Sequence, residues 1–137
     1  MKVDVIGTSY VGLTTALSLA YVEHEVVGVD LDEGKVAGLK RGEPPFYEPH
    51  AKETLALVRD RLSFTTRYQE AIPQAEVVFL SVGTPSLEDG SPNLSQVREA
   101  AWAIGWQGAR PDAAAEKALK AFILPRGPRP IPWPGGP

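Results

Sequence analysis

The sequence contains no cysteine and only two histidines among its 137 residues. The missing cysteines exclude disulfide bonds, thiolate metal sites and a cysteine nucleophile in this chain. No stretch approaches the roughly 20 apolar residues that span a bilayer. Near the N-terminus, Asp4 and Gly7 interrupt the apolar run, and no small-residue cleavage pattern follows. We therefore expect a cytoplasmic protein with no membrane partner and no metal site.

Charge is distributed unevenly along the chain. Residues 1–104 carry nine Lys or Arg and fifteen Asp or Glu, whereas residues 105–137 carry five and two. Seven of the 13 prolines also lie in the second segment. Its positive charges are too sparse to indicate a nucleic-acid partner. We therefore expect a folded domain over 1–104 and a divergent, basic, Pro/Gly-rich tail over 105–137, in which residues 116–125 have the composition for one added edge strand.

Apolar patterning predicts strands that alternate with helices. Short apolar runs predict strands at 2–7, 25–30, 62–66 and 76–83. Helical spacing predicts helices at 10–24, 31–42, 51–62, 67–75 and 94–105. Strands that are apolar along their length are typical of a parallel sheet covered by helices on both faces. The predicted fold is α/β: a doubly wound, mostly parallel, Rossmann-like sheet that is incomplete.

Particular residues are expected to face the core or to mark helix ends. An apolar stripe in the first helix comprises Val11, Leu13, Ala16, Leu17, Ala20 and Tyr21, and the inward residues of 51–62 are Leu55, Val58 and Leu62. Asp32 is a candidate N-cap, and Gly42 is a candidate helix stop.

The stretch "VIGTSYVGL", residues 5–13, resembles a dinucleotide-binding glycine loop that lacks one glycine. In G-x-G-x-x-G, the first glycine permits the tight turn, the second allows close approach of the pyrophosphate, and the third lets the helix pack on the strand. Gly7 and Gly12 occupy the first and third positions, and Ser9 occupies the second. Because Ser9 adds a Cβ and a hydroxyl at the closest contact, we expect cofactor binding to be weakened but not abolished.

An acid at the end of the second strand is the other half of this signature. Asp30 ends "VVGVD", 18 residues after Gly12, where it can hold the adenine ribose hydroxyls and favour NAD over NADP. In the alternative interpretation, the two glycines are ordinary turn residues and Asp30 caps the next helix.

Four segments together resemble the NAD-binding domain of the UDP-glucose/GDP-mannose dehydrogenase family, most closely its UDP-glucose 6-dehydrogenase branch. They are "MKVDVIGTSYVGL", "GVDLDEGKVAGLKRGEPPFYEP", "LSFTT" and "FLSVGTPSLEDGSPNLSQV". The resemblance covers residues 1 to about 104. It implies that the chain is a truncated member of this family.

The resemblance also implies a set of cofactor contacts. Those of the pyrophosphate loop are Gly7, Ser9, Tyr10, Val11 and Gly12. Asp30 and Lys35 match residues at the adenosine ribose, and the segment beside the nicotinamide half comprises Val82, Gly83, Thr84 and Pro85. Glu48 matches a motif residue that is structural or near the site, although it can equally cap the helix that follows.

The chain also departs from the family pattern. Ser9 replaces the middle glycine, and Glu23 stands where the family has a helix-ending glycine, which implies strain or a different cap. His50 also stands at a glycine position, and we predict that it is a surface residue. Neither histidine is assigned a catalytic role.

Members of the family oxidise the C6 alcohol of a nucleotide sugar to a carboxylate through a thiohemiacetal on a cysteine. Because this chain has no cysteine, we expect no turnover from it alone and assign no catalytic residue. Sugar-nucleotide binding then needs a second domain or a partner chain. Two alternatives stay open: a non-catalytic nucleotide-binding or interaction module, with a homodimer through an exposed sheet edge, and a functionless gene remnant.

Overall fold

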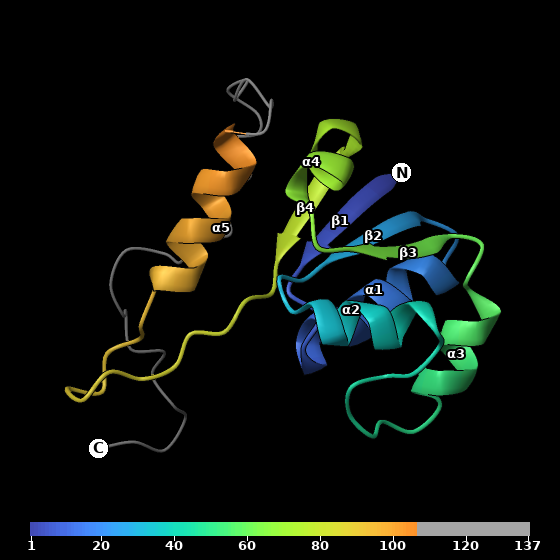
Figure 1. Cartoon of the computed structure of the whole chain (residues 1–137), viewed down its shortest axis with the longest axis horizontal. Coiled ribbons are helices and arrows are strands. Elements are labelled where there is room, and N and C mark those ends of the chain that lie inside the picture. Colours follow the sequence, from blue (N-terminus) through green and yellow to red (C-terminus); the bar gives the residue numbers. More distant parts are fainter. Residues whose placement is uncertain (107–137) are drawn as a thin grey trace, which may run out of the picture.

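The computed structural model describes residues 1–106, which contain a four-stranded sheet (Figure 1). Its strands are β1 (Lys2–Ile6), β2 (Glu25–Val29), β3 (Leu62–Thr65) and β4 (Val77–Leu80). They lie in the order β3-β2-β1-β4, and every neighbouring pair is parallel. Strand order therefore reverses at β1, because the chain moves outward from β1 to β3 and then crosses back to β4.

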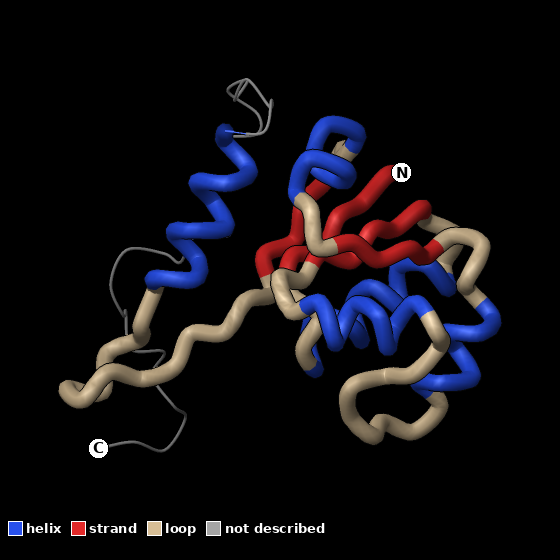
Figure 2. The backbone as a smooth tube through the Cα atoms, in the orientation of Figure 1, coloured by secondary structure: helices blue, strands red, loops and turns tan. Residues whose placement is uncertain are grey.

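Helices cover both faces of the sheet (Figure 2). One face carries α1 (Tyr10–Tyr21), α2 (Glu33–Lys40) and α3 (Ala51–Leu57), and the other carries α4 (Tyr68–Ala71), the short 3₁₀ helix η1 (Ile72–Gln74) and α5 (Ser95–Trp106). This arrangement confirms the predicted doubly wound α/β fold. It follows from right-handed crossovers, which place helices on opposite faces when the direction of travel reverses.

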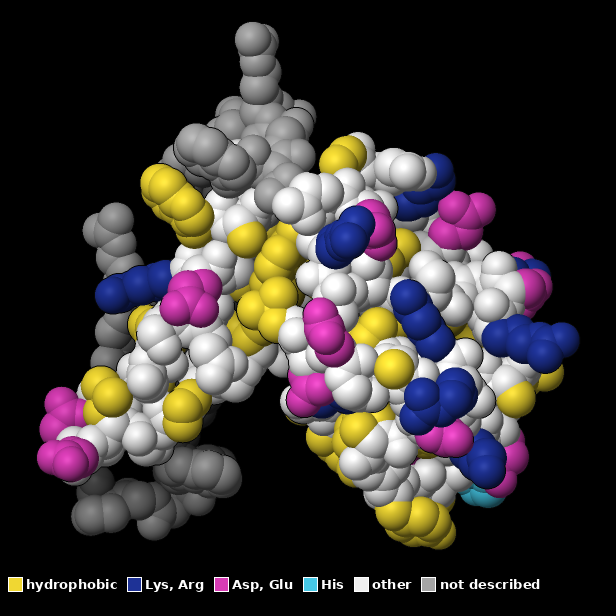
Figure 3. Space-filling model, viewed as in Figure 1, with side chains coloured by type: hydrophobic (Ala, Val, Ile, Leu, Met, Phe, Trp, Pro, Cys, Tyr) yellow, Lys and Arg dark blue, Asp and Glu magenta, His cyan; other side chains and the backbone are white. Residues whose placement is uncertain are grey.

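The core has one cluster on each face because successive strand residues point to opposite sides. Val3 and Val5 belong to the cluster under α1, α2 and α3, whereas Ile6 belongs to the cluster with residues of η1 and α5. In Figure 3, hydrophobic side chains line the groove between α5 and the rest of the molecule. There Ala100 and Ile104 are buried in the same cluster as Ile6.

Two residues of the predicted apolar stripe are not in the core. Leu13, Ala16, Leu17 and Ala20 are buried, but Val11 and Tyr21 are 66% and 63% exposed. Val11 precedes Leu13 by two residues and so lies about 200° around the helix from it. Tyr21 is the last residue of α1 and lies beside an open groove against residues 48–51. The prediction was wrong for both residues.

Helix ends follow the predicted signals more closely than helix lengths do. The Asp32 carboxylate caps α2 by accepting a hydrogen bond from the Lys35 backbone N–H, and Gly42 follows the helix at φ +82°. Leu55, Val58 and Leu62 are buried as predicted. The helix predicted over 51–62 nevertheless ends at Leu57, because Leu62 already pairs with Val26 as part of β3.

Glu23 adopts the backbone conformation that a glycine would take. Its φ is +72°, its N–H donates to the Ala20 carbonyl, and the His24 N–H donates to the Leu19 carbonyl. These two bonds form a Schellman motif, whose left-handed position is usually glycine. Of the two alternatives, strain is therefore the one observed. His50 is also left-handed, at φ +66°, and is exposed as predicted.

The predicted tail lies outside the described residues, apart from its first two residues, which complete α5. Within residues 1–106, every helix is too short or too polar to cross a membrane.

Candidate functional site

The turn from β1 into α1 requires glycine at position 7. Gly7 has φ +92°, and its N–H donates to the Val29 carbonyl at 2.7 Å. A Cβ at this position would lie 2.6 Å from the Ser81 carbonyl oxygen, at the end of β4. The loop therefore lies between the carboxyl ends of β2 and β4, and only a residue without a side chain fits there.

Gly12 is required for a different reason, the close packing of α1 on this loop. A Cβ on Gly12 would lie 1.8 Å from the Gly7 carbonyl oxygen. The first glycine of the pattern thus permits the tight turn, and the third permits close packing of the helix, as the motif predicts.

Ser9 occupies the N-cap position of α1 in an ordinary conformation. Its φ of −73° and ψ of −169° are open to any residue, so serine causes no backbone strain there. Its side chain makes no capping hydrogen bond, while its carbonyl accepts the first helical bond, from the Leu13 N–H, at 2.8 Å. The first-turn N–H groups have no acceptor within the helix, and no acidic residue lies in that turn. The start of α1 therefore favours an anion.

Asp30 joins the glycine loop to the end of β2. Its Oδ2 accepts hydrogen bonds from the Thr8 N–H at 2.9 Å, the Thr8 hydroxyl at 2.8 Å and the Lys35 ammonium at 2.9 Å. Burial raises the pKa of Asp30, but the hydrogen bonds from Lys35, Thr8 and the Asp32 N–H together outweigh it and lower that pKa below its ordinary value. The carboxylate is thus held ionised and in a fixed position.

These groups surround a cavity of about 340 Å³ at the carboxyl end of the sheet, where the strand order reverses. In open α/β sheets, this is the place where nucleotides bind. The cavity combines an anion-favouring helix start, a fixed carboxylate and the Ser9 hydroxyl. This donor and acceptor set fits the adenosine and pyrophosphate portion of a dinucleotide.

Six of the predicted cofactor residues line this cavity: Gly7, Ser9, Asp30, Lys35, Val82 and Gly83. Val11 and Gly12 belong to the adjoining first turn of α1. Thr84 and Pro85 are exposed and do not line it.

The side chain of Tyr10 points to another part of the molecule. Its ring lies 5.3 Å from the Phe46 ring, at an interplanar angle of 42°. A hydrogen bond to the Glu48 carboxylate and the charge of that carboxylate raise the pKa of Tyr10. The Tyr10 side chain therefore connects the loop 43–50 to α1, and Tyr10 does not line the cavity.

The sequence interpretation missed several residues of the site. Thr8 does not line the cavity but holds the Asp30 carboxylate that does. It lies inside the quoted loop, and a hydroxyl next to the first glycine was a readable signal. Tyr68 from α4 and Glu99 from α5 line the cavity. Burial, followed by the charges of Asp30 and Glu99, raises the pKa of Tyr68. No local pattern marked these two residues, because the crossover to β4 brings Tyr68 to the site and the segment after β4 brings Glu99 there.

Within residues 1–106, no group of three or more His, Asp or Glu side chains is placed to hold a metal ion.

Comparisons with known proteins match the part of the chain that contains this cavity. The model of the UDP-glucose/GDP-mannose dehydrogenase family, NAD binding domain, matches residues 1–113. UDP-glucose 6-dehydrogenase YwqF of Bacillus subtilis is 40% identical over 103 residues, which are 74% of this chain and 23% of that protein. UDP-glucose 6-dehydrogenase of Pseudomonas aeruginosa is 46% identical over 109 residues, 78% of this chain and 24% of that protein.

Solved structures agree. A ternary complex of GDP-mannose dehydrogenase from Pseudomonas aeruginosa superposes with a TM-score of 0.76 at 34% identity, over 78% of this chain and 25% of that one. UDP-glucose dehydrogenase from Pyrobaculum islandicum gives a TM-score of 0.72 at 39% identity, over 75% and 24%. The chain thus spans about a quarter of the length of these relatives. It belongs to the UDP-glucose/GDP-mannose dehydrogenase family, and the part that matches is the family's NAD-binding domain.

Proposed function

We propose that NAD binds in the cavity between the glycine loop, Asp30 and the segment after β4. The observation that carries this proposal is that the start of α1 and the Asp30 carboxylate face the same cavity. In this arrangement, the first-turn N–H groups at Tyr10, Val11 and Gly12 bind the pyrophosphate. Asp30 accepts hydrogen bonds from the adenine ribose hydroxyls, and Lys35 orients its carboxylate. Residues 82–85 line the path of the nicotinamide half.

An ionised Asp30 also favours NAD over NADP. The 2′-phosphate of NADP would meet a carboxylate that is 13% exposed and already holds three donors on one oxygen. Repulsion between the negative charges of this carboxylate and of the 2′-phosphate disfavours NADP.

We further propose that this domain serves a nucleotide-sugar 6-dehydrogenase of the UDP-glucose type. When bound, NAD supplies a hydride acceptor. The chain itself contributes the binding and orientation of the dinucleotide. Because it contains no cysteine, it should not turn over alone, and the sugar nucleotide requires a second domain or a partner chain.

Isothermal titration calorimetry of the full 137-residue chain with NAD tests the proposed site. We expect saturable binding in the micromolar to low millimolar range. The affinity for NAD should fall as the side chain at position 9 becomes larger, because φ at this position suits any residue and no backbone strain interferes. Ser9→Gly should bind NAD several-fold more tightly, and Ser9→Val at least about tenfold more weakly. The proposed site would be rejected if neither substitution changed the affinity for NAD, or if the folded wild-type chain did not bind NAD.

Absorbance at 340 nm tests the second proposal. The purified chain with NAD and UDP-glucose should form no NADH, and addition of a separately expressed sugar-nucleotide domain that contains the cysteine should restore formation. NADH formation by the chain alone would contradict it.

A non-catalytic module that pairs through a sheet edge is the alternative. It is supported by the sheet ends, since β3 and β4 each have one strand neighbour among the described residues, and open edges invite pairing. Concentration-dependent dimerisation in sedimentation velocity, without NAD binding, would favour it. A folded monomer that binds no adenine nucleotide would favour a functionless remnant.

A further inference from the structure

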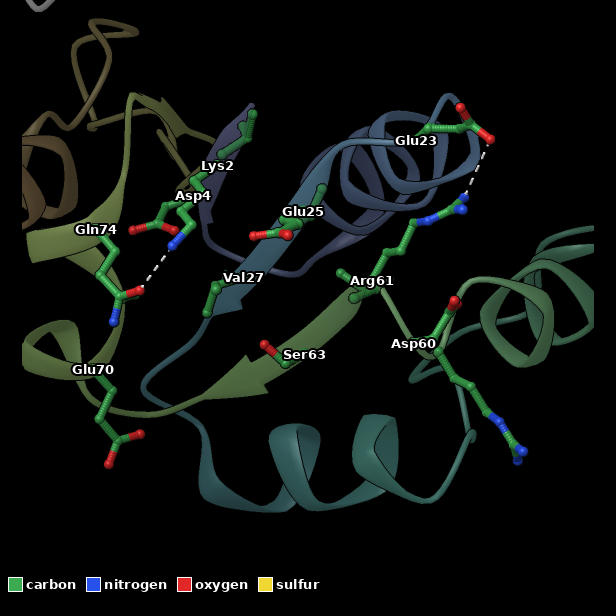
Figure 4. A pocket seen from close by; sticks show the side chains of 15 residues that line it. Lys2, Asp4, Glu23, Glu25, Val27, Asp60, Arg61, Ser63, Glu70 and Gln74 are labelled. Carbon is green, nitrogen blue, oxygen red and sulfur yellow. Dashed lines mark hydrogen bonds and ion pairs between the residues drawn. The ribbon is translucent and has the colours of Figure 1, made fainter.

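A second, larger cavity of about 410 Å³ lies at the opposite end of the sheet from the glycine loop (Figure 4). Its walls come from the first residues of β1, β2 and β3, from the turn before β3, and from α4 and η1. Nothing in the proposed NAD site uses this cavity. Its volume falls in the range of small-molecule sites.

Asp4 is the unusual residue of this cavity. It lies in the middle of β1 and faces the side of the sheet that carries α4 and η1, because Val3 and Val5 face the other side. Asp4 is only 2% exposed. Its Oδ2 has no hydrogen-bond partner among the described residues. A buried carboxylate without a partner is costly, and a positively charged donor compensates it best.

The surroundings of Asp4 are more acidic than basic. Five acidic side chains line the cavity, against three basic ones: Asp4, Glu23, Glu25, Asp60 and Glu70 against Lys2, Arg59 and Arg61. Two of the bases are already engaged, since Lys2 Nζ donates to Gln74 at 3.2 Å and Arg61 lies 3.7 Å from Glu23. Within residues 1–106, neither Asp4 nor Glu25 takes part in an ion pair.

Glu25 stands close to Asp4 in the sheet. The register pairs Lys2 with Glu25 and Asp4 with Val27, so the two acids lie on neighbouring strands, two rungs apart along the sheet and on the same face. Figure 4 shows Asp4, Glu25 and Glu70 around the cavity, from β1, β2 and α4.

From these observations we propose that the cavity binds a small organic cation, with its ammonium or guanidinium group held by Asp4 and Glu25. The absence of a three-residue metal-binding group within residues 1–106 favours an organic cation over a metal ion. The proposal is independent of NAD binding, because the two cavities share no lining residue.

The experiment uses the full 137-residue chain, titrated with 1,4-diaminobutane and agmatine and followed by ¹H–¹⁵N NMR. The uncharged 1,4-butanediol serves as a ligand of the same shape. Variants Asp4→Asn and Glu25→Gln remove one negative charge each. Glu53→Gln, on the exposed surface of α3 and away from the cavity, is the matched control. Because Asp4→Asn changes a buried residue, Glu25→Gln, at an exposed position, keeps the test valid if the first variant fails to fold.

We expect saturable shifts of the amides of residues 2–4, 25–27, 63, 70–72 and 74 with either cation and none with butanediol. Asp4→Asn should weaken binding at least about tenfold, Glu25→Gln several-fold, and Glu53→Gln not at all. Three outcomes would overturn the proposal: no saturable binding of the cations, equal binding of butanediol, or shifts that persist in Glu25→Gln and map elsewhere.

Discussion

At the scale of single residues, Thr8 connects the glycine loop to Asp30, which is 22 residues further along the sequence. It is fully buried, and both its N–H and its hydroxyl donate to Asp30 Oδ2. Two donors from one residue aim the carboxylate more firmly than either alone. The steric pattern of glycines therefore depends on a neighbouring hydroxyl to place the acid.

Replacing Thr8 with valine should remove the hydroxyl donor while preserving the shape of the side chain. We expect a loss of about 1–2 kcal/mol in the free energy of unfolding, because the bond is to a charged acceptor. NAD affinity should fall several-fold as the Asp30 carboxylate loses part of its orientation. Urea denaturation and calorimetry measure the two effects. Thr8→Ser keeps the hydroxyl and should retain most of both, and equal losses in the two variants would contradict this role.

A second prediction at the scale of single residues concerns Asp4 and the pH dependence of folding stability. Burial raises the pKa of Asp4 from 3.8 to about 6. Because the folded state then holds its proton more tightly than the unfolded state, this residue's contribution to stability is full below about pH 4 and is lost as pH rises to about 6. Asp4→Asn should therefore gain stability over the wild type across this range and keep the gain above it, by at most about 3 kcal/mol.

Thermal unfolding from pH 4 to pH 8 measures this difference. The other charged groups around Asp4 come from β1, β2, the turn before β3 and α4. They are the same in the wild type and in Asp4→Asn, so their contributions cancel in the difference between the two proteins. Asp89 is an opposite control, since hydrogen bonds from Ser91 lower its pKa, and Asp89→Asn should lose stability above pH 4. An Asp4→Asn difference that is constant with pH would show that Asp4 does not titrate in this range.

At the scale of elements, the end of α1 has glycine geometry without glycine. Glu23 completes the Schellman motif at φ +72°, and its ion pair with Arg61 is long and exposed. Exposed ion pairs contribute little, whereas a left-handed conformation costs a non-glycine residue about 1 kcal/mol or more. The hydrogen bonds that end α1 therefore hold Glu23 in a conformation that is unfavourable for a residue other than glycine.

Glu23→Gly should consequently stabilise the protein by about 0.5–1 kcal/mol, the relief of strain being partly offset by the greater flexibility of glycine in the unfolded chain. Glu53→Gly, inside α3, should instead destabilise it by about 1 kcal/mol. Chemical denaturation of the two variants distinguishes them by sign. A loss of stability in both would mean that Glu23 is not strained.

At the scale of the whole molecule, the crossover from β3 to β4 creates both cavities. It reverses the strand order at β1, which opens the NAD cavity at the carboxyl end. Its helical part is short, residues 68–74, and it forms one wall of the Asp4 cavity at the other end.

NAD should stabilise the whole described fold, because its proposed site joins β1, β2, β4, α1 and α5. At a concentration 100 times its dissociation constant, a ligand of the folded state adds about 2.7 kcal/mol. The melting temperature should rise with NAD in wild type and less in Ser9→Val. An equal rise in both would indicate binding outside the glycine loop.

Much of this protein is determined by its sequence. A side chain at Gly12 would clash with the Gly7 carbonyl of the same loop, and Asp32 and Gly42 act at helix ends, where hydrogen-bonding needs are local. Gly7 and Asp30 meet Ser81 and Thr8, which are distant in the sequence, but the glycine-loop motif marks both positions. Such needs recur in every fold of this kind, so the doubly wound parallel sheet, the loop and the acid were all predictable. The exposure of Val11 and Tyr21 was not, because helical spacing identifies a stripe but not how far the neighbouring elements cover it.

Only the tertiary structure decided which distant side chains meet. Tyr68 and Glu99 reach the NAD cavity, and Asp4, Glu25 and Glu70 surround the other, because parallel strands and crossovers bring together residues with no regular spacing in the chain. Burial at Asp4 depends on the elements that surround its side of the sheet, and nothing in "KVDVIG" signals it. Sequence thus determines conformations that a residue and its neighbours require, whereas desolvation and charge at a site arise from the sum of all elements packed around it.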